Sequence, residues 1–171
     1  MSPRNTHDDD AAFDEFVTVV WRRLHWSAYM LTGDAYLAED LAQTALVKTY
    51  VVWPKVRRAD ALAYARKVLV NANIDRLRRR HLTEVSRDVQ PFDAPGSEVE
   101  DRDQLVRLLG GLTQQERKVL VLRHYFDLPE ADVANELGVS VGTVKSTASK
   151  ARAKLREGAG RAGATRLRGV G

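Results

Sequence analysis

Residues 112–155 constrain the fold of this chain more than any other stretch, because helix-start and helix-stop signals recur there at regular intervals. Thr113 and Glu116 have the spacing of a capping box, in which a hydroxyl and a carboxylate close the first turn of a helix. Pro129 suits the first turn of a second helix. Gly138 tolerates the left-handed conformation that often ends a helix. The stretch therefore predicts two short helices followed by a tight turn.

A third helix is predicted directly after this turn, and its outer side is basic. Ser140 is a favourable N-cap for a helix that extends from Val141 to about Leu155. Two helices joined by a glycine-containing turn form a helix-turn-helix, although an ordinary helical hairpin with a solvated basic face is an alternative. Side chains on the outer side can donate hydrogen bonds to phosphates and base edges. These are Thr143, Lys145, Ser146, Ser149, Lys150 and Arg152.

Charge is distributed unevenly along the chain, although the formal net charge is only +4. Residues 54–80 contain nine basic and two acidic residues, and residues 145–171 contain eight basic residues and one acid. Residues 84–103 contain seven acids and two arginines. Two basic segments separated by an acidic one predict two contacts with a polyanion and a connector that does not bind it.

The composition excludes several classes of protein. The chain has no cysteine, which excludes disulfides and thiolate metal sites, and its four histidines do not share the spacing of metal ligands. No cofactor is therefore expected, and no nucleophile constellation predicts an enzyme. No apolar run approaches the ~18–20 residues that span a membrane, and the acidic N-terminus lacks the features of a secretory signal. The sequence predicts a cytoplasmic protein without a membrane partner.

Helical periodicity of the apolar residues covers most of the chain and predicts an all-α fold. It is interrupted in the acidic segment, which contains Pro91 and Pro95 and is read as a flexible linker. Both ends of the chain have the polar or glycine-rich composition of disordered segments. The predicted organisation is a disordered arm (1–12), a first helical domain (13–80), a linker (81–102), a helix-turn-helix domain (103–157) and a disordered basic tail (158–171).

Three segments of this chain, taken in order, resemble one protein family. They are AEDLAQTALVKTY at 38–50, VLVNANIDRLRRR at 68–80, and LTQQERKVLVLRHYFDLPEADVANELGVSVGTVKS at 112–146. The chain resembles the extracytoplasmic-function (group 4) sigma factors of bacterial RNA polymerase, within the sigma-70 family, over residues 13–156. The resemblance implies two small helical domains, a σ2-like domain of three or four helices and a σ4-like helix-turn-helix domain, joined by a flexible linker. It also implies a promoter-specificity subunit that has no enzymatic activity of its own.

The resemblance implies that the helix at 38–50 docks on the clamp helices of the polymerase β′ subunit. The residues that match the family's motif at this interface are Asp40, Leu41, Gln43 and Thr44. A solvated helix face with Leu41 buried is the alternative. The other implied partners are the β flap of core RNA polymerase, promoter DNA and an anti-sigma protein, which is common in the family.

The resemblance further implies that the third σ2 helix and the loop before it open the promoter −10 element. The loop 55–60 aligns with the segment that holds a flipped base, and Asn71 and Asp75 align on the helix that reads this element. The residues expected to contact the −10 element are Arg57, Arg58, Tyr64, Asn71, Asp75, Arg76, Arg78 and Arg79. Asp75 stands at the base-reading position, where a carboxylate can accept a hydrogen bond from cytosine N4, and an intrahelical pair with Arg78 or Arg79 is the alternative. Many members carry a Trp-Leu pair early in this helix, and here Tyr64 is the only ring nearby.

In the σ4-like domain, the third helix would lie in the major groove of the −35 element. The residues that match the family's base- and phosphate-contacting positions are Lys145, Ser146, Ser149 and Lys150, with Thr147 where an arginine is frequent. Lys154, like Arg152, is assigned to the DNA backbone. The alternative function is a stand-alone helix-turn-helix regulator, which would need a sensor or dimerisation domain in the N-terminal half.

Overall fold

All regular structure in the described part of the chain is helical. A computed structural model describes the backbone of residues 6–82 and 100–168, and the side chains of residues 8–82 and 104–161. It contains no β-strand within these ranges, which confirms the predicted all-α class. The chain divides into two compact units, residues 1–88 and 89–171. The core of the predicted linker, residues 83–99, lies outside the described residues.

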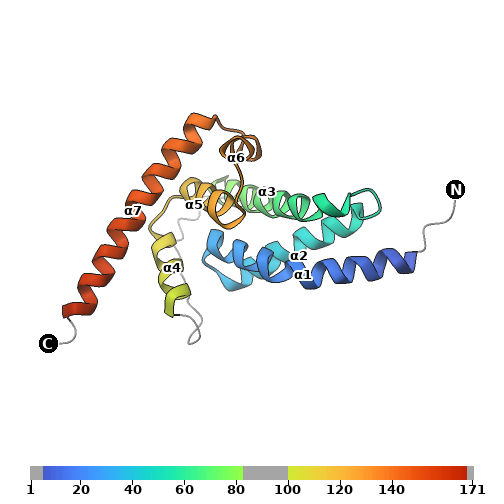
Figure 1. Ribbon diagram of the computed structural model, residues 1–171, viewed down its shortest axis with the longest axis horizontal. Helices are drawn as coiled ribbons and strands as arrows, with labels where there is room; N and C mark the ends of the chain where they lie inside the picture. Colours follow the sequence, from blue (N-terminus) through green and yellow to red (C-terminus); the bar gives the residue numbers. More distant parts are fainter. Residues whose placement is uncertain (1–5, 83–99, 169–171) are drawn as a thin grey trace. The chain divides into compact units, whose positions relative to one another are not determined.

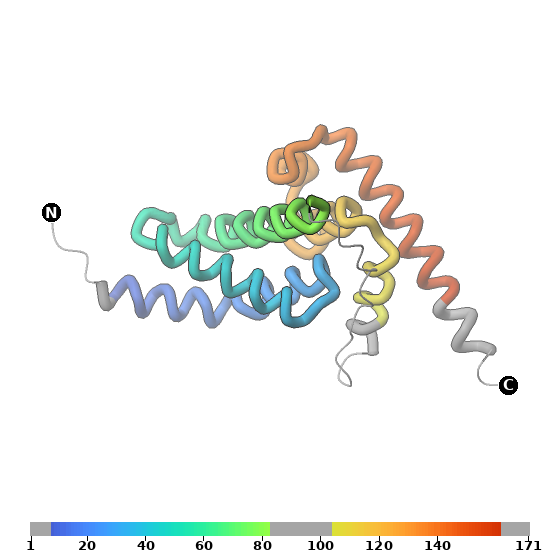
Figure 2. The backbone as a smooth tube through the Cα atoms, turned by 180° about the vertical axis from the view of Figure 1, so that it is seen from behind, coloured from blue at the N-terminus to red at the C-terminus, as the bar shows by residue number. Residues whose placement is uncertain are grey.

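Three long helices make up the first unit: α1 (Thr6–Thr32), α2 (Ala35–Val52) and α3 (Ala61–Leu82). Each helix contacts the other two, and the three lie side by side in Figures 1 and 2. Asp34 caps α2 by accepting a hydrogen bond from the amide of Leu37 at 3.0 Å. A short 3₁₀ segment, η1 (Arg58–Asp60), leads from α2 into α3. Burial of leucines such as Leu24 and Leu69 away from water stabilises the bundle.

The second unit contains four α-helices and one π-helical segment among its described residues. They are α4 (Glu100–Gly110), α5 (Gln114–Leu120), the π-helical η2 (Val121–Tyr125), α6 (Glu130–Leu137) and α7 (Val141–Arg168). Helix α7 contacts α4, α5 and α6, and it is the long helix at the red end of the colour scale in Figure 1. Its apolar residues pack with those of α5 and α6 in a core that excludes water. The fully buried core side chains include Val106, Val119, Leu122, Val133 and Val144.

The local signals of the helix-turn-helix are confirmed, except that Pro129 lies one position before the predicted first turn. The amide of Glu116 donates to Thr113 Oγ1 at 3.2 Å and the amide of Thr113 donates to Glu116 Oε2 at 2.8 Å, which completes the capping box. Gly138 is left-handed with φ 66° and ψ 37°, and Ser140 Oγ accepts from the amide of Thr143 at 3.1 Å. Pro129 is the N-cap of α6 rather than a first-turn residue, because its ψ of 152° is extended.

The predicted disordered N-terminal arm is wrong from residue 6 onward, because α1 begins at Thr6; residues 1–5 lie outside the described residues. Carboxylates in a first turn favour a helix, since they face the positive end of its dipole. The helix start is also held by α2. The indole Nε1 of Trp53 donates to the carbonyl oxygen of Asp9 at 3.0 Å, and Tyr50 Oη donates to Asp10 Oδ1 at 2.8 Å. These contacts join residues that are 40 and 44 positions apart, so local composition could not predict them.

The predicted end of the third helix-turn-helix helix is also wrong, because α7 continues beyond Leu155 to Arg168. Most of the predicted disordered tail is therefore helical; residues 169–171 lie outside the described residues. Alanine and arginine are strong helix formers and offset the glycines of this segment. Gly158 also permits close packing, since a Cβ at this position would lie 2.8 Å from Leu108 Cδ2 of α4.

Candidate nucleic-acid interface

Helix α7 presents its polar donors to solvent and its small apolar residues to the core. Val144, Ala148 and Ala151 recur at helical spacing and are at most 5 % exposed. The opposite side carries all six residues predicted to contact DNA in this unit, and every one of them is exposed. The fold therefore brings together a donor-rich surface, which we call the α7 face: Thr143, Lys145, Ser146, Ser149, Lys150 and Arg152.

Residues near the start of α7 also make contacts within the unit. The hydroxyls of Ser140 and Thr143 lie 2.9 Å apart, and Ser146 Oγ donates to the carbonyl of Thr143 at 3.1 Å. Lys145 Nζ lies 3.8 Å from Glu130 Oε2 of α6, with 65 % of its side chain exposed. Such an exposed pair contributes at most about 1 kcal/mol. Lys145 can therefore exchange this carboxylate for a base edge or a phosphate at little cost.

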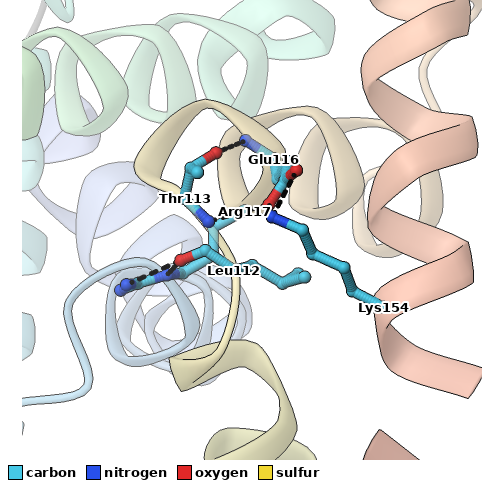
Figure 3. A network of polar contacts seen from close by, with 5 residues as sticks. All are labelled: Leu112, Thr113, Glu116, Arg117 and Lys154. Atoms are coloured by element: carbon cyan, nitrogen blue, oxygen red, sulfur yellow. Dashed lines mark hydrogen bonds and ion pairs between the residues drawn. The ribbon is translucent and has the colours of Figure 1, made fainter. Parts of the chain in front are cut away.

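Lys154 does not belong to the α7 face, although it was assigned to the DNA backbone. Its ammonium lies 2.9 Å from both carboxylate oxygens of Glu116, and Figure 3 shows the two side chains meeting between α5 and α7. Burial by itself raises the pKa of Glu116, but hydrogen bonds from Thr113 and Lys154 outweigh it and hold that pKa below its usual value. The Lys154 side chain is 45 % exposed and its charge is paired with Glu116 in this state, so its assignment to the DNA backbone stays a prediction.

Arg117 is a buried cation of this unit that the sequence pattern did not reveal. It is 7 % exposed, and its Nε and Nη2 donate to the carbonyl of Leu112 at 3.2 and 3.1 Å (Figure 3). Burial lowers the pKa of Arg117. The guanidinium thereby ties the start of α5 to the segment that follows α4, so a basic residue in a basic unit has a structural task.

In the first unit, most of the cations and polar residues predicted for the −10 element lie on the outside of α3. Asn71, Asp75 and Arg78 are exposed and Tyr64 is half-buried, and their spacing puts them on one side of the helix. Arg79 is also exposed, and its Nε donates to the backbone carbonyl of Asp75 at 3.4 Å. We call these residues the α3 face: Tyr64, Asn71, Asp75, Arg78 and Arg79.

Arg76 is separated from the α3 face by its burial. It is half-buried, and its Nη2 donates to the amide oxygen of Asn73 at 3.1 Å. Burial lowers the pKa of Arg76, and the nearby charge of Arg80 lowers it further, while Asp34 acts in the opposite sense. Its Nε is buried with no hydrogen-bond partner. The guanidinium of Arg76 therefore lies partly against the bundle in this state, and its contact with DNA stays a prediction.

The two arginines before α3 differ in how firmly they are held. Arg57 is exposed and lies 3.8 Å from Asp60. Arg58 Nη2 lies 3.1 Å from Asp9 Oδ1, and its guanidinium carbon lies 3.8 Å from the centroid of the Trp53 ring. This stacking fixes Arg58 over an aromatic face, while about half of its side chain (49 %) stays exposed.

Helix α2 has an exposed side that includes Asp40 and Gln43. Gln43 Nε2 donates to Glu39 Oε1 at 3.1 Å, and Thr44 is half-buried. Leu41 is only 4 % exposed, so its side chain packs in the core, as the alternative expects, and its contact with the polymerase stays a prediction.

A groove of about 420 Å³ lies between α1 and α2, beside this exposed side. It is lined largely by apolar side chains, including Phe13, Val17 and Leu46. Val47 and Val51 of α2 are 62 % and 74 % exposed. This apolar surface was not predicted from the sequence, because the same residues fit the helical spacing of a core.

Among the described residues, no group of three or more histidine, aspartate or glutamate side chains could hold a metal ion. None of the helices described is both long and apolar enough to cross a lipid bilayer.

Comparison with known proteins gives consistent matches along the chain. The family model Sigma-70 region 2 matches residues 16–83, and the model Sigma-70, region 4 matches residues 102–155. The chain is 39% identical over 157 residues to the RNA polymerase sigma-E factor of Streptomyces avermitilis, covering 88% of this chain and 87% of that protein. It is 33% identical over 150 residues to the ECF RNA polymerase sigma factor SigM of Mycobacterium tuberculosis, covering 86% and 76%.

Two solved structures are similar in fold. The sigma factor RpoE of Bartonella quintana, in complex with the anti-sigma factor NepR, aligns with a TM-score of 0.69 at 23% identity, covering 86% of this chain and 96% of that one. The extracytoplasmic function sigma factor SigJ of Mycobacterium tuberculosis aligns with a TM-score of 0.59 at 27% identity, covering 83% and 52%.

Proposed function

The chain belongs to the sigma-70 family as an extracytoplasmic-function sigma factor that directs promoter-specific transcription, and we propose which surface performs each task. The domain of residues 13–80 binds core RNA polymerase through α2 and the −10 element through the α3 face. The domain of residues 103–157 binds the −35 element through the α7 face. The observation that carries this assignment is the exposure of all six predicted donors of α7 opposite its buried Val144, Ala148 and Ala151.

The α7 face suits the major groove, because a groove about 12 Å wide admits one helix with its side chains. Lys145 and Lys150 supply positive charge, and the hydroxyls of Ser146 and Ser149 can donate to or accept from base edges. Thr143, near the first turn, and Arg152, at the far end of the face, contact phosphates on either side. In this arrangement bases set the sequence preference, and the cations supply affinity that depends on salt.

The α3 face suits single-stranded bases and their backbone. Arg78, Arg79 and the exposed Arg57 neutralise phosphates, and Tyr64 offers a ring on which a base can stack. Asp75 accepts from cytosine N4, while Asn71 offers both a donor and an acceptor. Unstacking bases costs a few kcal/mol per step. Contacts between the α3 face and the unstacked bases of the open strand must offset this cost. Arg58 keeps its contacts with Trp53 and Asp9, and the exposed part of its side chain contacts the DNA backbone.

Core polymerase binds the exposed side of α2. Asp40, Gln43 and Thr44 meet the β′ clamp helices, and the β flap holds the second domain. The polymerase makes every covalent bond, so the chain performs no catalysis and needs no cofactor. It acts in the cytoplasm, and an anti-sigma protein is a further partner that follows from family membership.

Run-off transcription over a genomic library, with core polymerase and this chain together and each alone, tests the proposal. We expect discrete promoter-dependent transcripts only when both are present, and co-purification of the chain with core polymerase. A discrete footprint of the free chain on duplex DNA, without any association with polymerase, would instead identify a stand-alone regulator. The library also reveals the promoter sequence, which the later experiments use.

A further inference from the structure

We infer that Glu116 and Lys154 form a positioning pair that sets the orientation of α7, so that Lys154 controls promoter selectivity without touching DNA. The inference rests on the proposed role of the α7 face at the −35 element. It assigns Lys154 a task different from that of Lys145 and Lys150, which lie on the same helix but on its exposed face.

Glu116 is fixed before it meets Lys154. Its carboxylate is part of the capping box of α5, where Oε2 accepts the amide of Thr113 at 2.8 Å. The residue is only 6 % exposed, so it cannot turn away to water. The Lys154 ammonium bridges Oε1 and Oε2 at 2.9 Å each (Figure 3). The cation on α7 is thereby tied to a rigid point on α5.

The apolar contacts of α7 need such a directional partner. Two of its buried residues, Ala148 and Ala151, carry only a methyl group and let the helix approach the core closely. Val144 is also buried, and Gly158 lies close to Leu108 of α4, so apolar packing holds α7 against the core, although apolar burial itself is not directional. A charge-assisted hydrogen bond is directional, and at 2.9 Å the positioning pair is shorter than the exposed Lys145–Glu130 pair at 3.8 Å, so it adds the stronger directional constraint.

The distance along α7 from the positioning pair to the α7 face is long enough for a small tilt to affect DNA recognition. Lys154 is nine residues beyond Lys145, which is about 13.5 Å along the axis at the usual helical rise. A tilt of about 5° at the positioning pair would displace the helix at Lys145 by about 1.2 Å, which exceeds the ~0.5 Å tolerance of a binding constellation. Contacts to phosphates tolerate such a shift better than hydrogen bonds to base edges.

The test compares salt dependence with selectivity for the full chain assembled with core polymerase, on the promoter from the genomic library and on one with a scrambled −35 element. The variants are Lys154→Met, which keeps the stem but removes the charge, and Glu116→Gln, which keeps an oxygen for the Thr113 amide. Lys154→Arg is the conservative variant that can restore the pair. Lys150→Met, on the α7 face, is the matched control.

We expect Lys154→Met to leave the slope of log affinity against log salt unchanged and to lower selectivity by on the order of threefold to tenfold, as for coupled neighbours. Glu116→Gln should lower selectivity in the same way, and Lys154→Arg should retain that of the parent. Lys150→Met should reduce the magnitude of the slope by about 0.9, the loss of one phosphate contact. Circular dichroism checks folding, and Glu116→Gln carries the test if Lys154→Met does not fold.

Two results would overturn the inference: a slope reduced by about 0.9 in Lys154→Met, as expected of a phosphate contact, or unchanged selectivity in both Lys154→Met and Glu116→Gln. An unchanged slope in Lys150→Met would instead overturn the proposed role of the α7 face. The two failures are therefore distinguishable.

Discussion

The left-handed conformation of Gly138 allows a quantitative prediction about the turn between α6 and α7. Its φ is +66°, and a Cβ built at this position meets no atom within 4 Å. Gly138→Ala therefore adds no clash, and its cost is the backbone strain of an L-residue in this region, about 1–2 kcal/mol. Gly138→Asn should cost less, because asparagine tolerates the left-handed region better.

Gly160 provides a control with the same chemistry and the opposite expected sign. It lies within α7, with no neighbour within 4 Å of an added Cβ and no left-handed φ. Gly160→Ala should therefore stabilise the second unit by up to about 1 kcal/mol, the usual difference between these residues in a helix. The pair of variants separates backbone strain from the mere addition of a methyl group.

Urea unfolding with two probes measures both effects. The three tryptophans, at positions 21, 26 and 53, all lie in the first unit, so their fluorescence follows that unit, while far-UV circular dichroism follows both. With a denaturant slope of about 1 kcal/mol per molar for a unit of this size, Gly138→Ala should lower the second unit's midpoint by about 1–2 M. The tryptophan midpoint should not move. A Gly138→Ala protein as stable as its parent would refute the strain argument.

Three further predictions concern charge and the α2 surface. Lys145→Ala should reduce transcription from promoters with an intact −35 element more than from scrambled ones in a run-off assay; equal losses would place Lys145 on the DNA backbone. Because the folded-state pKa of Glu116 lies below its ordinary value of 4.5, its contribution to stability is complete above that pH and is lost as pH falls through the folded pKa. Acid unfolding of the second unit followed by circular dichroism should show this loss, and Lys154→Met should diminish it. Val47→Lys, at a residue 62 % exposed, should weaken co-purification with core polymerase without changing the urea midpoint of tryptophan fluorescence; unchanged co-purification would exclude the groove side of α2 from that interface.

The sequence by itself determined the elements of the helix-turn-helix, because their signals act over a few residues. Each signal acts within a few residues and is found as predicted: the capping box of Thr113 and Glu116, the left-handed conformation of Gly138 and the N-cap at Ser140. The spacing of apolar residues likewise predicted an all-α chain and the buried side of α7. Family membership was also predictable, since it rests on motifs read in linear order.

Only the tertiary structure decided which charged residues are paired within the protein, because the partner of a charge can be distant in sequence. Lys154 meets Glu116 across 38 residues and Arg58 meets Asp9 across 49, so neither pairing could be read from local charge or spacing. The same holds for Arg76 and Leu41, which lie beside exposed neighbours on their own helices but turn toward the bundle. Helical periodicity tells that a helix has a buried side, and only packing against the other helices decides where that side ends.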